Sequence, residues 1–393
     1  AAAVSFGTFC QTANNLSDVT AATARSNLGL AIGTNVQAYS GVLNTLATSA
    51  QASLDNRIIN GDFLIDQIRE GASVTPAANG YAIDMWATTA AAALLSKLTF
   101  QQQSATAPPN FKNALYVLAA SAATPGTSDY SLLYQTPEGI QVADLQFGTA
   151  NALNIMLSFQ VYASVTGTYC VSLRNSAVNR SYVATFSVGS ANTWTQVTLS
   201  IPGDTSGTWL TAAGAIGMYL AFDLGCGSTF QAAANTWSAG NFLSASGAVQ
   251  LVANAAAKLY IANVRLYPGS VAMPYAPRAF GTEMSLCQRF FEKSFAPGTA
   301  PAQSAGTADA VSVVSQAAAT FGGGVSFKVQ KAKAPSVTTY NPSAANANWR
   351  DATNGADRTA TVGTIGQNGF QITGASGAAG ANNLIHYFAN GGL

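Results

Sequence analysis

Charged side chains are scarce in this sequence of 393 residues. Asp, Glu, Lys and Arg together make up 8% of it, against roughly a quarter of an average soluble domain. The net charge is only +1, whereas a nucleic-acid backbone or an anionic lipid surface requires clustered basic residues. We therefore expect neither nucleic acid nor a charged membrane surface as a partner.

Cysteine and long apolar runs are also in short supply. The four cysteines, Cys10, Cys170, Cys226 and Cys287, are spaced too irregularly for a disulfide framework or a zinc site. We expect them to be reduced and mostly buried, as in a protein folded in bacterial cytoplasm. No apolar run approaches the ~20 residues needed to cross a bilayer, and the N-terminus lacks the basic start of a secretory signal. We expect no membrane insertion, no metal and no other cofactor.

Small residues and aromatic rings fill the chain instead, and the aromatic share of 10% is enough to build a core. Within residues 58–278 apolar and polar residues alternate, and Gly, Asn, Ser and Pro clusters separate the runs. Such period-2 runs, without amphipathic helices between them, predict an all-β fold with a jelly-roll β-sandwich. The alternation is clearest in residues 153–162, 169–173, 197–201 and 216–222.

A second, smaller β-sandwich is predicted for residues 298–393. With only about 100 residues it has little core of its own, so we expect neighbouring copies to complete it. Lys328, Lys331 and Lys333 alternate along this part of the chain. We interpret them as a charged strand edge that opposes pairing between sheets.

Helical patterns flank the large β region. Residues 16–29 predict a short helix, and the apolar spacing in residues 36–50 is heptad-like. A stripe this thin favours association with other copies, although a helix lying on the body of its own chain would also account for it. Residues 282–293 have helical spacing as well, with Thr282 as a candidate N-cap. We therefore divide the chain into an anchoring and trimerisation segment (1–55), the sandwich (56–279), a helical linker (280–297) and the C-terminal domain (298–393).

Residues 56–86 carry the most specific motif, NRIINGDFLIDQIREGASVTPAANGYAIDMW. It resembles the opening of a β-sandwich module found in bacteriophage tail fibres and related virion fibres, which has the pattern IxNGDFxIxQ, a loop and YxxDxW. Residues 259–278 are similar to the closing strand of that module, and residues 286–293 to the segment that follows it. Residues 16–29 resemble the NLSDVxxAxxARxNLGL repeat near the base of such fibres. The C-terminal part is similar to the domain that often follows the module.

This resemblance implies a homotrimeric bacteriophage fibre located in the virion and assembled in the bacterial host cytoplasm. Its N-terminal segment would attach to other virion proteins, either a tail adaptor or baseplate or the capsid. Its sandwich loops would bind host-surface polysaccharide or lipopolysaccharide. We expect no enzymatic activity, because the candidate catalytic groups have simpler structural roles. The alternatives are a head fibre or capsid decoration protein and, as a third class, a polysaccharide depolymerase.

Candidate catalytic groups have simpler structural explanations. A glycosidase needs two carboxylates roughly 5 to 9 Å apart, and the densest acidic group is Asp62, Asp66, Glu70 and Asp84. Carboxylates beside turns accept backbone N–H groups, and Asp62 and Asp84 belong to the structural signature of the related module. The one histidine, His386, lies in a strand pattern and is expected to be structural. We assign no catalytic residue.

Tryptophans in polar loops are the better candidates for function. Sugar rings stack their C–H faces on Trp and Tyr, while amide and hydroxyl side chains bind the sugar hydroxyls. Trp209, Trp237 and Trp349 lie in Gly-, Ser- and Asn-rich sequences, so we predict that they bind glycan. The alternative is that each closes the end of a sandwich core, since tryptophan is usually largely buried.

Overall fold

The computed structural model describes Thr20, Ala22 and residues 56–76, 78–270, 272–273, 276–316, 320–375 and 377–393. The chain divides into two compact units, Ala1–Gln51 and Ala52–Leu393. The predicted N-terminal helix, the heptad-like segment and Cys10 lie outside the described residues. Among the described residues, no helix is long and apolar enough to cross a membrane.

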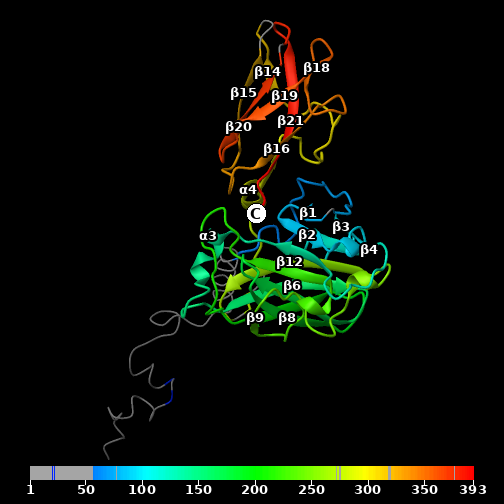
Figure 1. Cartoon of the computed structure of the whole chain (residues 1–393), viewed down its shortest axis with the longest axis vertical. Helices are drawn as coiled ribbons and strands as arrows, with labels where there is room; N and C mark the ends of the chain where they lie inside the picture. Colours follow the sequence, from blue (N-terminus) through cyan, green and yellow to red (C-terminus); the bar gives the residue numbers. More distant parts are fainter. Residues whose placement is uncertain are drawn as a thin grey trace, which may run out of the picture. The chain divides into compact units, whose positions relative to one another are not determined.

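Two antiparallel sheets form a sandwich over residues 80–268 (Figure 1). The predicted all-β class and the sandwich arrangement are confirmed for this part of the chain. The first sheet has the order β1 (Gly80–Ile83), β2 (Trp86–Ala90), β5 (Tyr130–Gln135), β10 (Tyr219–Cys226), β7 (Gly167–Arg174), β8 (Arg180–Val188) and β11 (Trp237–Ala239). The second has the order β3 (Leu98–Gln103), β4 (Ala114–Ala119), β12 (Lys258–Pro268), β6 (Ile155–Ala163) and β9 (Thr195–Ile201).

The core between these sheets follows from the period-2 pattern. Leu157, Phe159 and Val161 alternate along β6 and are all buried, because every second side chain of a strand faces the same side. The rings of Phe159 and Phe222 meet edge to face at 5.1 Å. Trp86 is fully buried and lies 6.2 Å from the ring of Phe222. Large aromatic side chains therefore fill the space between the two sheets.

The motif of residues 56–86 forms a hydrogen-bond network around Asn60 at the edge of this core. Asn60 has a left-handed backbone (φ 55°), and its side-chain amide donates to the carbonyl oxygens of Ile65 (2.7 Å) and Asp84 (3.0 Å). Its side-chain oxygen accepts from the amide of Ile65 at 3.0 Å. The indole of Trp86 donates to the carbonyl of Asn60 at 3.0 Å. These residues hold the entry of the sandwich together, which agrees with the scaffold role that the sequence predicted.

The C-terminal sheets are organised around one long strand, β21 (Asn382–Asn390), shown in red in Figure 1. Four strands pair with it: β13 (Phe291–Lys293), β14 (Val311–Val314), β16 (Ser336–Tyr340) and β17 (Trp349–Asp351). The strand β18 (Ala356–Arg358) extends this sheet beyond β17, and a separate sheet has the order β15 (Phe321–Ser326), β20 (Gly369–Gly374) and β19 (Ala360–Gly363).

Helix is confined to short segments of the described part. The helix predicted for residues 282–293 is shorter and begins earlier: α4 (Phe280–Gln288) follows Ala279. Residues 291–293 form β13 instead, because Phe290 and Phe291 are fully buried and β13 completes the sheet beside β21. The other short helices are α3 (Gly139–Val142), η2 (Ala92–Leu94), η3 (Ala143–Leu145), η4 (Ser228–Phe230) and η5 (Leu251–Ala253).

The prediction that three lysines form a charged strand edge is wrong. Residues 327–335 connect β15 to β16 without forming a strand, so Lys328, Lys331 and Lys333 do not lie on a strand edge. Lys331 is fully buried and its Nζ lies 2.6 Å from a carboxylate oxygen of Glu292, which is also fully buried. The ammonium also donates to the carbonyls of Gln288 (2.5 Å) and Val329 (3.0 Å). These hydrogen bonds and the ion pair compensate the free-energy cost of burying the Lys331 ammonium between α4 and the C-terminal sheets.

Candidate functional site

The three predicted tryptophans occupy two different settings. Trp349 is 0% exposed in the core of the C-terminal sheets. Its indole donates to the carbonyl of Thr373 at 3.1 Å, and its ring meets Phe321 at 5.3 Å. A ring buried on all sides has no face for a ligand, so Trp349 is corrected from a candidate binding residue to a core residue.

Trp209 and Trp237 come together at one edge of the sandwich. Their ring centroids are 5.6 Å apart and the planes are nearly perpendicular, at 85°. Phe147 meets both of them edge to face, at 5.0 Å and 5.8 Å. Tyr182 lies 5.2 Å from Trp237, its partner across the β8–β11 pair. We call Phe147, Tyr182, Trp209 and Trp237 the tryptophan cluster.

Both indoles of this cluster are fixed by the loop that connects β9 to β10. The Nε1 of Trp209 donates to the carbonyl of Ser206 at 3.1 Å, and the Nε1 of Trp237 donates to the carbonyl of Pro202 at 2.7 Å. Since each ring is held by packing and by its N–H group, the cluster is preorganised and loses little side-chain entropy on binding a ligand.

An ion pair anchors the same loop to the sheet. Arg180 binds Asp204 through two parallel hydrogen bonds, Nε–Oδ2 at 2.9 Å and Nη2–Oδ1 at 2.5 Å. Gly207 has φ +80° and packs directly on the Arg180 side chain, where a Cβ atom would lie 2.6 Å from Cγ. Gly148 approaches the loop equally closely, and its amide donates to the carbonyl of Asp204 at 2.7 Å. The loop conformation therefore depends on two glycines and one bidentate pair.

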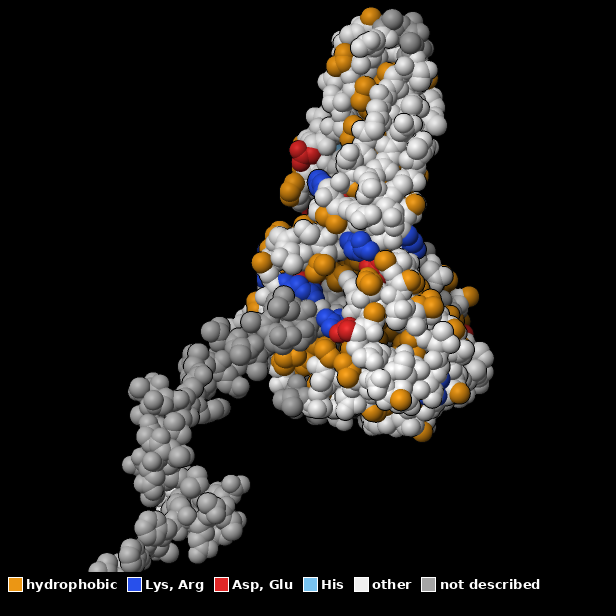
Figure 2. Space-filling model, turned by 90° about the vertical axis from the view of Figure 1, so that its left-hand side faces the viewer, with side chains coloured by type: hydrophobic (Ala, Val, Ile, Leu, Met, Phe, Trp, Pro, Cys, Tyr) orange, Lys and Arg blue, Asp and Glu red, His pale blue; other side chains and the backbone are white. Residues whose placement is uncertain are grey.

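The tryptophan cluster offers the two kinds of contact that a sugar needs. Trp209 and Trp237 are partly exposed, so their rings can pack on C–H faces. Thr205, Ser206 and Thr208 are exposed beside them and carry hydrogen-bonding hydroxyl or backbone groups. Figure 2 shows how little charge the described surface carries in one view, with the charged side chains gathered in its middle part.

A second aromatic surface was missed by the sequence prediction. Tyr116, Tyr162 and Tyr260 are neighbours across β4, β12 and β6, and Trp194 lies just before β9. Tyr116 and Tyr260 stack at 4.6 Å, and Trp194 lies 5.7 Å from Tyr162. We call these four residues the tyrosine strip. The sequence did carry a signal for this strip. Along β4, β6 and β12 the tyrosines alternate with the core residues, at outward-facing positions where polar residues are expected.

The buried acids Asp84 and Asp66 have structural partners. Asp84 accepts from the side chain of Gln67 (2.7 Å) and the amide of Ile68 (3.2 Å), and burial raises the pKa of Asp84 to about 7. Asp66 accepts from the backbone amides of Arg69 and Gly71. These carboxylates hold residues 67–71 in place. The sequence predicted such a structural role for acidic residues beside turns.

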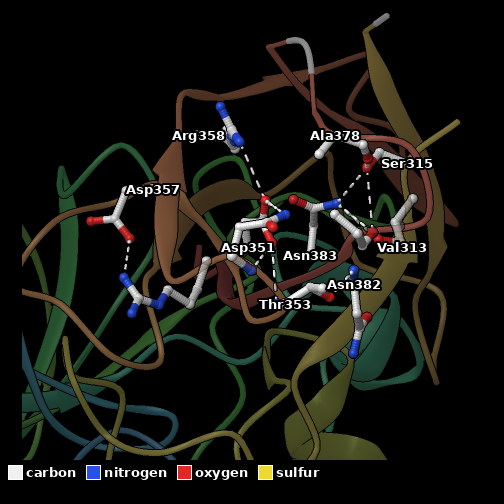
Figure 3. Close-up of polar contacts among 12 residues, drawn as sticks. Val313, Ser315, Asp351, Thr353, Asp357, Arg358, Ala378, Asn382 and Asn383 are labelled. Atoms are coloured by element: carbon white, nitrogen blue, oxygen red, sulfur yellow. Dashed lines mark hydrogen bonds and ion pairs between the residues drawn. The ribbon is translucent and has the colours of Figure 1, made fainter. Parts of the chain in front are cut away.

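The C-terminal sheets hold a comparable polar network (Figure 3). Asp351, fully buried, accepts from Asn354 at 2.8 Å and 2.9 Å and from Arg358 at 3.3 Å. Asp357 pairs with Arg350 at 3.2 Å. The contacts in Figure 3 tie the β17–β18 hairpin to β21 and the neighbouring loops. Each of these carboxylates is engaged by a cation or an amide.

His386 is structural, as predicted. It is 1% exposed in β21, where its ring stacks on Phe295 at 4.1 Å and an angle of 13°. Its Nδ1 lies 3.0 Å from the hydroxyl of Ser294 and its Nε2 lies 3.0 Å from the carbonyl of Gly306. Burial lowers the pKa of His386, so the ring is neutral at pH 7 and serves the packing of the junction.

No protein-family model and no curated protein matches this chain. Among solved structures, the chain is similar to a carbohydrate-binding module described as "CBM4 structure and function", at 11% identity over 53% of this chain and 98% of that chain, with a TM-score of 0.29. It is also similar to the enzymatically active domain of tailspike protein 4 of bacteriophage CBA120, at 12% identity over 55% and 21% of the two chains, with a TM-score of 0.28. A family 11 carbohydrate-binding module from Clostridium thermocellum, in complex with a mixed-linked tetrasaccharide, covers 47% of this chain and 88% of its own at 12% identity, with a TM-score of 0.25. Similarity at this level transfers no function, so the proposal rests on the residues of this chain.

Proposed function

We propose that this protein is a structural fibre protein of a bacteriophage virion that binds glycan on the host surface. The tryptophan cluster carries the binding half of the proposal, because its two partly exposed indoles are held rigidly beside hydroxyl-bearing side chains. Such fixed aromatic rings with adjacent hydrogen-bonding groups suit sugar recognition. The fibre half is supported by the motif of residues 56–86.

The proposal includes a homotrimer in which residues 1–55 anchor the fibre to other virion proteins and the sandwich is of the jelly-roll type. Three copies would present three tryptophan clusters to a repetitive polysaccharide. Weak binding by each copy then becomes strong adsorption, because the second and third binding events are intramolecular. Lipopolysaccharide and capsular polysaccharide both supply such repeated ligands.

Two alternatives share this architecture. A head fibre or capsid decoration protein would differ in where the N-terminal segment docks, and electron microscopy of virions carrying a label on this protein separates head from tail. A polysaccharide depolymerase would release reducing ends from host polysaccharide incubated with the purified protein. An absence of new reducing ends would remove that alternative.

The binding surface is tested by titrating the full-length protein against polysaccharide from the host and against a glycan array. We expect the double variant Trp209→Ala/Trp237→Ala to lose binding by about tenfold or more, since aromatic contacts of this kind contribute of the order of 1 kcal/mol each beyond their buried area. Phe280→Ala is the matched control, because Phe280 is an aromatic residue 60% exposed outside both aromatic surfaces.

The tyrosine strip provides the competing location. If Tyr116→Ala/Trp194→Ala abolishes binding while the Trp209/Trp237 double variant binds normally, the site belongs on the strip and our assignment to the tryptophan cluster is wrong. If no glycan binds the native protein, the proposed function itself fails.

A further inference from the structure

A separate pocket lies where the sandwich meets the C-terminal sheets. Its volume is about 300 Å³, at the lower end of the range of roughly 300–1,000 Å³ typical of ligand pockets. Aromatic contacts join its two sides: the ring of Tyr81 meets Phe291 at 4.7 Å, and Phe291 stacks on Phe388 at 6.3 Å. We call it the junction pocket, and its lining includes Arg69, Asn79, Tyr81, Tyr340, Phe388 and Asn390.

Arg69 is the charged side chain of this lining, and its donors are largely unused. Its Nη2 donates to the carbonyl of Tyr81 at 3.4 Å, which is long for a hydrogen bond. Its Nε is buried without a hydrogen-bond partner in the described part of the chain. Burial raises the pKa of the nearby Asp66, and the charge of Arg69 opposes that rise. The Asp66 carboxylate nevertheless accepts its hydrogen bonds from the backbone amides of Arg69 (2.9 Å) and Gly71 (2.7 Å), and not from the guanidinium. No ion pair involves Arg69 within the described residues.

Aromatic and amide side chains surround this guanidinium. Tyr81, Tyr340 and Phe388 are all partly exposed, so their rings remain accessible from the pocket. Burial raises the pKa of Tyr81 to about 12 and also raises that of Tyr340, although the nearby Arg69 charge opposes the latter. Both phenols therefore stay protonated at neutral pH and can donate hydrogen bonds, as can the amides of Asn79 and Asn390.

We infer that the junction pocket binds a carboxylate-bearing sugar unit, with the acid on Arg69 and the sugar ring against the tyrosines. A guanidinium presents a planar fork of donors that matches a carboxylate in a bidentate pair. The tyrosine rings supply faces for the sugar C–H groups, and the two amides supply partners for its hydroxyls. This inference rests on the proposed function, because it presumes a glycan ligand, and it narrows that ligand to acidic glycans.

The test compares oligosaccharides that differ only by oxidation at C6. Galacturonate and galactose oligomers of equal length and linkage, and the corresponding glucuronate and glucose oligomers, are titrated calorimetrically against the full chain. In at least one pair, we expect the uronate to bind about tenfold or more tightly than its neutral counterpart, because hydrogen bonds between charged groups are stronger than those between neutral groups. The preference should shrink as salt is added.

Arg69→Gln should remove this preference while leaving the weaker affinity for the neutral member. Arg69→Lys keeps the charge but loses the fork, so it should retain part of the preference, and it serves as the second variant if the first misfolds. Arg350→Gln is the matched control, since Arg350 lies outside the pocket lining and pairs with Asp357, and it should keep the full preference.

A preference that persists in Arg69→Gln, or equal binding of both members of every pair, overturns the inference while leaving glycan binding intact. Failure of every oligosaccharide and of host polysaccharide to bind the native protein overturns the proposed function together with it.

Discussion

Lys331 and Glu292 form an ion pair with both side chains fully buried. The carboxylate also accepts from the hydroxyl of Tyr387 at 2.8 Å and from the amide of Lys328. Burial lowers the pKa of Lys331, and the hydrogen bond and charge of Glu292 oppose that effect. Removing one partner leaves the other charge buried without its counter-charge, which is far more costly than replacing both.

We therefore expect Lys331→Met to lower the free energy of unfolding by about 3–5 kcal/mol, measured by urea titration at a fixed protein concentration. The double variant Lys331→Met/Glu292→Gln should recover much of that loss. Lys258→Met, at an exposed position, should stay within about 0.5 kcal/mol of the native protein. Equal losses in the single and double variants would contradict this account of the pair.

Asp223 predicts a pH dependence of stability. Burial raises its pKa to about 7, against the opposing hydrogen bonds from Ser244 and Gly225, and its Oδ2 has no hydrogen-bond partner in the described part. As pH rises above about 4 the unfolded chain releases this proton first. The contribution of Asp223 to the free energy of unfolding should therefore fall up to about pH 7 and then level off.

Asp223→Asn should flatten that slope by up to about 1.4 kcal/mol per pH unit. Chemical denaturation at a series of pH values between 4 and 8 measures the slope in both proteins. Parallel curves for the native protein and the variant would show that Asp223 ionises in the folded state as it does in the unfolded chain.

At the scale of elements, the loop between β9 and β10 allows a matched test of a close contact. Gly207 and Gly247 have nearly equal φ angles, +80° and +81°. A Cβ atom added to Gly207 would lie 2.6 Å from the Arg180 side chain, whereas one added to Gly247 would have no neighbour within 4 Å. Gly247→Ala should cost about 1 kcal/mol for the left-handed backbone alone. Gly207→Ala should cost more and should also weaken glycan binding, because Arg180 must move away from Asp204.

Denaturation and glycan titration of the two variants separate these effects. If both variants lose the same stability and bind glycan equally well, the packing of Gly207 on Arg180 does not position the tryptophan cluster.

The same scale shows what the sequence could predict. The alternation of residues such as Leu157 and Phe159 depends on one strand and its neighbours, so the sandwich could be predicted. The end of α4 could not, because the residues from Phe291 onward pair with β21, a strand distant in sequence. Likewise, nothing in the local sequence distinguishes Trp349 from Trp209, since burial of the former depends on Phe321 and Thr373. Pairwise contacts between distant segments decide these cases.

For the whole molecule, the proposed trimer predicts a mass in solution of about three times the 40.1 kDa of one chain. Light scattering coupled to size exclusion measures it directly. Because we place trimerisation in residues 1–55, removing them should weaken association. The affinity for a single oligosaccharide should be unchanged, but adsorption to host cells should be much weaker. A monomeric full-length protein would contradict the trimer and most of the fibre proposal.

The arrangement of the C-terminal sheets has a consequence for biosynthesis. β13 leaves the ribosome well before β21, yet Phe291 pairs with Asn390 and Lys293 with Phe388. The sandwich strands can therefore collapse while Phe290 and Phe291 still lack their final partner, and the late, non-local pairing is expected to be the slow step of maturation. A nascent chain paused before residue 382 would leave the aromatic residues Phe290 and Phe291 without the strand that covers them.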